Sequence, residues 1–63
     1  MNHQEYTFAR RALLGGSHVV VGTVPVSEQR IRIIQLRTKD GQYQGKYLGD
    51  GKWYPVHSVE VQS

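Results

Sequence analysis

The sequence contains no cysteine, so two common ways of stabilising a small protein are absent. Disulfide bridges and cysteine-type zinc sites are both excluded. A chain of 63 residues forms one domain, which we place at residues 1–63. Such a domain buries about 60% of its unfolded surface and is marginally stable alone. Association into a homodimer or a larger homo-oligomer is therefore the expected source of further stability, and an unassisted monomer is the alternative.

Long apolar runs and a basic leader segment are also missing. No stretch approaches the roughly 20 apolar residues of a membrane-spanning helix. The opening residues, MNHQEYTF, lack the basic start and the apolar core of a signal peptide. We therefore expect a cytoplasmic protein with no membrane partner.

Metal ligands and catalytic groups are sparse. The three histidines are scattered, with no second histidine or carboxylate at ligand spacing, so neither a metal nor a cofactor is expected. Five acidic residues stand against eight Lys and Arg, and no two of the acids are placed for general acid–base work. The sequence therefore predicts a protein that is not an enzyme. Its net charge of +3 permits a nucleic-acid or an acidic protein partner and requires neither.

The first segment with a clear pattern predicts a helix over residues 2–14. Asn2 can cap it, and Glu5 completes a capping box three residues later. Gly15 and Gly16 supply the stop, because a residue after a helix commonly needs left-handed geometry. An edge strand that begins at residues 6–8 is the alternative. Four apolar residues are expected on one helix face: Phe8, Ala9, Ala12 and Leu13.

The next two β-branched runs predict strands over residues 17–24 and 29–38. Gly22 inside the first run indicates a bulge or a bend. Pro25 ends the first strand, because it offers no N–H group, and Ser27 and Glu28 form the turn.

The second of these strands changes the phase of its alternation. Ile31 and Ile33 share one face, and after them Ile34 and Leu36 are the apolar residues. Because a strand alternates with a period of two, this slip predicts a bulge near Ile33 and Ile34, with Ile31, Ile33 and Leu36 in the core.

Two Asp-Gly pairs predict hairpin turns at Gly41 and Gly51, both with positive φ. They bound strands over residues 42–48 and 52–56. In the first of these, Tyr43 and Tyr47 share the core-lining face. Pro55 ends the second, a single helical turn follows at residues 57–58, and a fifth strand covers residues 59–61. The fold class is therefore mostly β (α+β).

The end of the chain, GKWYPVHSVEV at residues 51–61, resembles the ending of Src-homology-3-like small barrels. In many of these proteins an aromatic strand leads into a proline, a short helical turn and a final valine-rich strand. The resemblance implies an N-terminal helix, residues 2–14, followed by a five-stranded antiparallel barrel over residues 17–61.

The same ending is similar to that of the plasmid-borne type II dihydrofolate reductases. Tyr54, Pro55 and Val56 match its Tyr-Pro-Val, and a Val-Glu pair follows. That family's active surface uses Val-Gln-Ile-Tyr, whereas this chain has Gly-Lys-Trp-Tyr and keeps the tyrosine alone. The resemblance supports a barrel and a homo-oligomer, and it argues against that chemistry. An oligomeric enzyme of this kind is the second alternative function.

Aromatic and basic residues concentrate in the predicted strands, where the aromatics can fill the core and the cations can form a solvated face. Trp53 and Tyr54 are neighbours in one strand and point opposite ways, so one of them is expected to face outward. The predicted binding surface combines these aromatics with basic residues: Arg30, Arg32, Lys46 and Lys52.

This surface indicates a small non-enzymatic binding or regulatory accessory protein that acts by protein–protein interaction. The alternative is a barrel that binds RNA or a single strand, through phosphate contacts and stacking. The modest positive charge favours the protein partner.

Overall fold

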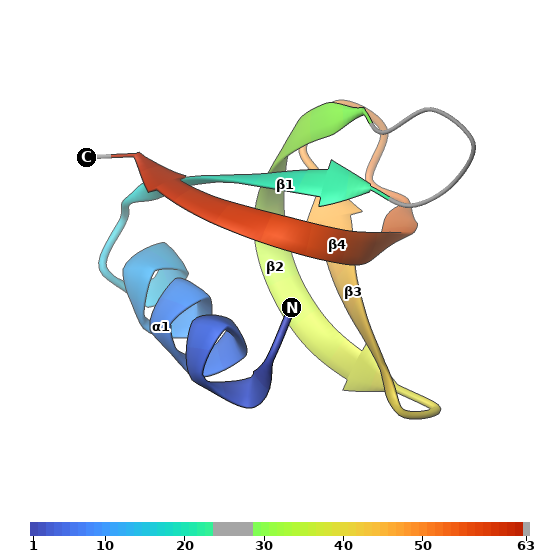
Figure 1. Ribbon diagram of the computed structural model, residues 1–63. Helices are drawn as coiled ribbons and strands as arrows, with labels where there is room; N and C mark the ends of the chain where they lie inside the picture. The colour runs from blue at the N-terminus through green and yellow to red at the C-terminus, as the bar shows by residue number, and fades with distance from the viewer. Residues whose placement is uncertain (24–28, 63) are drawn as a thin grey trace.

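The computed structural model describes residues 1–23 and 29–62. One N-terminal helix precedes four antiparallel strands (Figure 1). The predictions for residues 24–28, including the proline end of the first strand and the turn after it, lie outside the described residues. The elements are α1 (His3–Leu14), β1 (His18–Thr23), β2 (Arg30–Lys39), β3 (Gln42–Tyr47) and β4 (Trp53–Gln62).

The helix α1 is capped as its sequence predicts. The Glu5 N–H donates to Asn2 Oδ1 at 2.9 Å, and the Asn2 N–H donates to Glu5 Oε1 at 3.3 Å. At the other end the Gly15 N–H donates to the Arg11 carbonyl at 3.0 Å. The predicted helix is confirmed, and the alternative of an edge strand at residues 6–8 is wrong.

The helix face that packs inward differs in part from the predicted one. Tyr6 and Ala9 are buried, and Ala12 and Leu13 pack against the core. Phe8, expected on that face, has 64% of its surface exposed. Tyr6 is buried on this face, and its ring centroid lies 5.0 Å from that of Tyr43 on β3.

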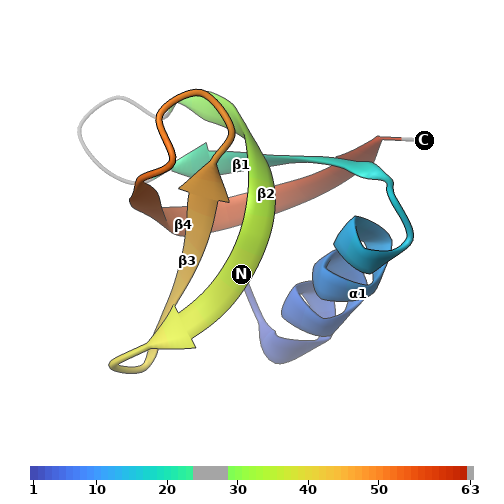
Figure 2. The ribbon, with the colours of Figure 1, turned by 180° about the vertical axis from the view of Figure 1, so that it is seen from behind.

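The four strands form a ring-like sheet. Each strand pairs antiparallel with the next, and β4 pairs with β1 to close the ring (Figures 1 and 2). Asp40 (φ 52°) and Gly41 (φ 76°) join the Lys39–Gln42 pair in a two-residue hairpin. Two positive φ values are the signature of a type I′ turn, which matches the twist of the flanking strands. The turn predicted at Gly41 is confirmed.

Residues 53–62 form one strand where two were predicted, so the described residues form four strands and not five. The helical turn at residues 57–58 is wrong, because β4 runs unbroken through these residues. Pro55 pairs with Gln44 at the end of the β3 ladder, and Val56 begins the β1 ladder. Pro55 has no N–H group to donate, and the strand tolerates this where its partner changes from β3 to β1.

Both predicted bulges are confirmed. The pairing of β2 with β3 shifts between Ile33 and Gln35, and that of β1 with β4 shifts between Gly22 and Thr23. The first shift lets Ile33 and Leu36 both point inward.

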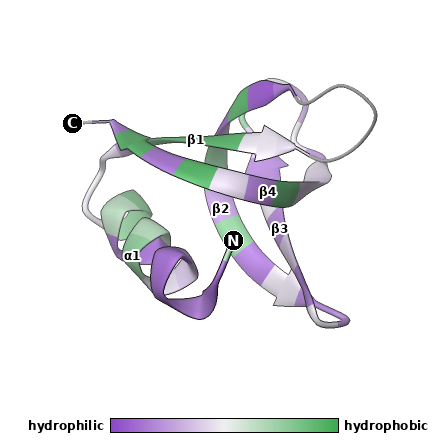
Figure 3. Ribbon diagram, in the orientation of Figure 1, coloured by the Kyte–Doolittle hydropathy of each residue, from purple (hydrophilic) through white to green (hydrophobic). Residues whose placement is uncertain are grey.

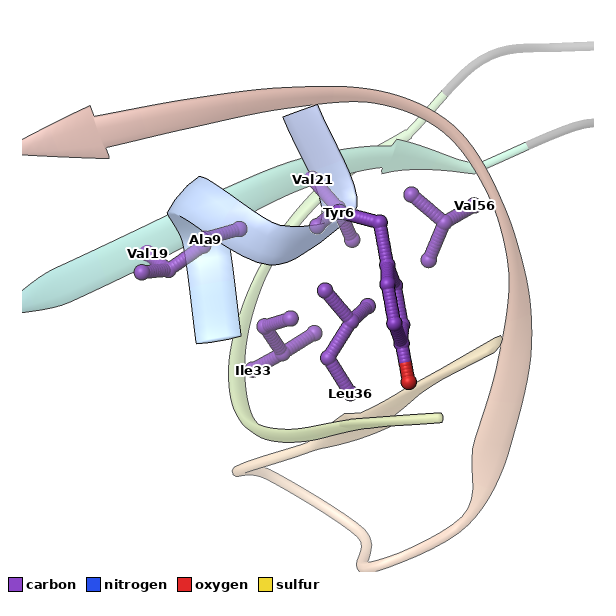
Figure 4. Close-up of a cluster of buried hydrophobic side chains, with 7 residues drawn as sticks. All are labelled: Tyr6, Ala9, Val19, Val21, Ile33, Leu36 and Val56. Carbon is purple, nitrogen blue, oxygen red and sulfur yellow. The ribbon is translucent and has the colours of Figure 1, made fainter. Parts of the chain in front are cut away.

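The core lies inside the ring, and α1 covers its open side (Figure 4). Figure 4 shows the Tyr6 side chain pointing from the helix into the space beside Leu36 and Val56. Figure 3 shows apolar residues on β1, at several positions along β4 and in the C-terminal half of α1. None of the described helical residues forms a segment long and apolar enough to cross a membrane. The buried apolar residues are Tyr6, Ala9, Val19, Val21, Ile33, Leu36 and Val56.

Candidate binding groove between helix and sheet

The two aromatic residues of the predicted surface lie on opposite sides of β4, and each is half-buried. Tyr54 is on the side of Val56, which faces the core. Its ring meets the ring of Tyr47 edge-on, with 6.0 Å between the centroids and 77° between the planes. Its hydroxyl donates a hydrogen bond to a carboxylate oxygen of Asp50. Tyr54 therefore helps to hold the loop between β3 and β4.

This hydrogen bond changes the acidity of both partners. The Tyr54 hydroxyl, followed by the backbone N–H of Lys52, holds the pKa of Asp50 below its usual value. Asp50 in turn raises the pKa of Tyr54, because the bond keeps the phenol proton in place. The loop is thus fixed by an ionised carboxylate and a neutral phenol at neutral pH.

Trp53 lies on the outer side of the sheet, beneath an arginine from β2. The guanidinium carbon of Arg37 is 3.9 Å from the centroid of the Trp53 ring. Its Nε–H donates to Gln44 Oε1 at 3.0 Å. The stacking and the hydrogen bond together fix the plane of this guanidinium group, a geometry in which arginine binds carboxylates or phosphates well.

Lys46 is the predicted site residue that adjoins Trp53. The strand register aligns Gln35, Lys46 and Trp53 in one row across β2, β3 and β4. The next row on the same face of the sheet holds Arg37, Gln44 and Pro55. Neither row contains a carboxylate, so this outer face carries positive charge beside an aromatic ring.

The other predicted basic residues occupy different places. Arg30 and Arg32 pair with β1, opposite Gly22 and Val20. Arg30 forms an ion pair with Glu60 of β4, the one ion pair within residues 1–23 and 29–62. Lys52 is exposed in the loop that leads into β4. Of the predicted set, Trp53 and Lys46 come together, whereas Arg30 and Arg32 lie in the first half of β2, which pairs with β1.

A groove of about 450 Å³ separates the C-terminal half of α1 from β2. Its size falls within the range of ligand pockets. Leu14 is 87% exposed and Ile34 is 45% exposed, so the apolar part of the groove is open to solvent. The groove is lined by Arg10, Leu13, Leu14, Ile34, Gln35, Leu36, Arg37 and Trp53.

Arginines stand on both walls of this groove. Arg37 comes from the sheet, and Arg10 comes from the helix, where its guanidinium carbon lies 5.6 Å from the centroid of the Tyr6 ring. Four aliphatic side chains also line the groove: Leu13, Leu14, Ile34 and Leu36. The groove can therefore hold an apolar group and two negative charges.

Sequence reasoning missed most of the groove. The phase slip in β2 was a usable signal for Ile34, since it turns that residue outward. No signal of this kind exists for Leu14, Arg10 or Arg37, because their meeting depends on where the helix packs.

Comparison with family models, with curated proteins and with solved structures found no significant match. The described residues contain no group of three or more side chains that could hold a metal ion. The chain is therefore classed by its architecture, a small α+β domain with one helix and a ring-like antiparallel sheet.

Proposed function

We propose that this chain is a small non-enzymatic binding or regulatory protein that acts by protein–protein interaction through the groove between α1 and β2. The observation that carries the proposal is the exposure of Leu14 and Ile34 in a groove that two arginines also line. Exposed apolar side chains beside Arg and Trp are typical of interface centres, where the partner removes them from water.

The apolar part of the groove favours a protein over a nucleic acid. A nucleic acid offers phosphates and base faces, which suit Arg37, Lys46 and Trp53. It makes little use of exposed aliphatic side chains such as Leu14 and Ile34. A protein partner can cover these aliphatic side chains and pair with the arginines at the same time.

Site-specific photo-crosslinking in the native host tests this proposal. A photoreactive amino acid replaces Leu14 in one variant and Phe8 in the other. Both side chains are large, apolar and exposed, and both lie on α1, but the groove is lined by Leu14 and not by Phe8. Phe8 is therefore a matched control for Leu14.

We expect a discrete protein adduct from position 14 and none from position 8, with the adduct unchanged by nuclease treatment. Adducts to nucleic acid alone, or the same adducts from both positions, would contradict a protein partner at this groove.

Nucleic-acid binding is the second candidate, and the stacking of Arg37 on Trp53 beside Lys46 supports it. Fluorescence anisotropy with labelled oligo-dT and oligo-U across a salt series tests it. If this candidate is right, Lys46→Gln weakens binding and reduces the salt slope by about one.

We also propose that the ring-like sheet has the architecture of a small Src-homology-3-like barrel. Its closed strand order and the bend of β2 at the bulge support this comparison. The fifth strand of such barrels has no counterpart in residues 1–23 and 29–62.

A further inference from the structure

One edge of β2 has no neighbouring strand along half of its length. Within the described residues, β1 pairs with β2 from Arg30 to Ile33, whereas β3 pairs with β2 as far as Lys39. Beyond Ile33, the side of β2 that faces away from β3 therefore borders the groove. The groove is lined by the first four residues of this unpaired stretch, Ile34, Gln35, Leu36 and Arg37.

The hairpin register shows which backbone groups point to this open edge. In a two-residue hairpin the closing pair, Lys39 and Gln42, exchanges both of its hydrogen bonds. Because alternate residues of an antiparallel strand point to opposite sides, Arg37 also points toward β3. Leu36 and Thr38 then present their N–H and C=O groups to the open edge. Such unpaired groups are a template for another strand.

The charged residues that line the groove beside this edge, Arg10 and Arg37, are both positive. Apart from the Nε–H bond to Gln44, no hydrogen bond of the Arg37 guanidinium occurs within the described part of the chain, so its terminal N–H groups can meet a ligand. Three of the described acids are engaged elsewhere: Glu5 caps the helix, Asp50 holds Tyr54, and Glu60 pairs with Arg30. The fourth, Asp40, is exposed in the hairpin turn beyond Thr38 and does not line the groove.

We infer that the open edge of β2 accepts an extended segment of a partner protein in which acidic side chains alternate with aliphatic ones. The segment adds a strand through the backbone groups of Leu36 and Thr38. Its carboxylates pair with Arg37 and Arg10, and its aliphatic side chains cover the exposed Leu14. Strand addition obtains affinity from main-chain hydrogen bonds and specificity from alternate side chains. This inference rests on the proposed function and names its partner chemistry.

The probe for a direct test is a short acetylated peptide that alternates Glu and Val. Its effect on the amide signals of isotope-labelled full-length protein is followed by NMR. We expect shifts along residues 34–38 and at the Trp53 indole, with slower amide exchange at Leu36 and Thr38. A peptide that alternates Lys and Val should produce no shifts, because it repels Arg10 and Arg37.

Two controls separate the parts of the inference. Arg37→Gln should weaken the binding of the acidic peptide about tenfold, because a charge-assisted bidentate contact is lost. Arg32→Gln removes the same charge from the same strand outside the groove and should change affinity less than about twofold. An acidic peptide that is N-methylated at alternate residues keeps its side chains, loses its edge hydrogen bonds and should not bind.

Three results would overturn the inference: no shifts with the acidic peptide, equal binding of the Lys-Val peptide, or shifts confined to residues 57–62. Oligo-dT binding at residues 34–38 in place of the acidic peptide would also overturn it, in favour of nucleic acid. If the peptide fails while position 14 still crosslinks a protein, strand addition is wrong and the proposed function stands. If position 14 crosslinks only nucleic acid, the proposed function is wrong.

Discussion

Gly45 faces Ile33 and Val56 across the inside of the ring. A Cβ atom at this position would lie 2.8 Å from Ile33 Cγ2 and 3.2 Å from Val56 Cγ2. We predict that Gly45→Ala lowers the free energy of unfolding by about 1–3 kcal/mol, because the core has no space for the methyl group. Chemical denaturation measures the change, and Gln42→Ala, at an exposed position of the same strand, is the control. Equal stability of the two variants would refute the tight packing.

The bond between Tyr54 and Asp50 predicts a dependence on pH. Tyr54→Phe removes the donor, so the pKa of Asp50 should rise toward its ordinary value of 3.8. Because the folded pKa of Asp50 lies below its unfolded pKa, the bond stabilises the fold above the unfolded value. That contribution is lost as the pH falls through the folded pKa. The wild type and the variant should therefore converge in stability at low pH.

The raised pKa of Tyr54 acts in the opposite direction. Its contribution is fully present below the ordinary tyrosine value of 10.0 and is lost as the pH rises through the raised value. NMR titration of the Asp50 carboxylate in both proteins measures the effect. The same Asp50 pKa with and without the Tyr54 hydroxyl would rule out the coupling.

Single residues could be predicted where the pattern is local. Alternation places Trp53 and Tyr54 on opposite sides of one strand, and the structure agrees. Alternation does not place Arg37 over Trp53, because that contact depends on how β2 coils past β4.

At the scale of elements, the β2–β3 hairpin depends on Gly41, whose φ is 76°. We predict that Gly41→Val lowers the free energy of unfolding by about 1 kcal/mol or more, because a β-branched residue is strained at positive φ. Gly41→Asn should cost less, since asparagine tolerates this region. Gly51, with φ 70°, should respond to valine in the same way. Unchanged thermal melting of both valine variants would remove this account of the turns.

The helix and both bulges could be predicted because their signals lie within a few residues. The capping box and the phase slip at Ile33 are examples. The continuous strand β4 could not be predicted in this way. The effect of Pro55 depends on which strand lies beside it, and that neighbour changes from β3 to β1 at this residue.

At the scale of the whole molecule, the chain length predicts self-association. A homo-oligomer gains stability by mass action, so its melting temperature should rise with protein concentration. Scanning calorimetry over a wide concentration range measures this dependence. A constant melting temperature, together with a monomeric mass by sedimentation, would instead support the unassisted monomer.

The groove is a property of the whole molecule, and for this reason the binding surface predicted from the sequence shares only Trp53 with its lining residues. Arg10 and Leu14 come from the helix, and Ile34 and Arg37 come from β2. No local pattern states where a helix will dock on a ring of strands. The basic residues that the alternating pattern does place on one face, Arg30 and Arg32, lie in the first half of β2, which pairs with β1, and neither of them lines the groove.

The central claim is that a partner protein binds at the groove. Its most direct test measures how tightly two matched double variants bind the partner protein that crosslinking at position 14 identifies. The groove variant combines Leu14→Ser with Arg37→Gln, and the control combines Phe8→Ser with Arg32→Gln. Each removes one exposed apolar side chain of α1 and one charge of β2. By isothermal titration calorimetry the groove variant should bind about a hundredfold more weakly than the wild type, and the control within about threefold of it. Equal losses in the two variants would contradict binding at the groove.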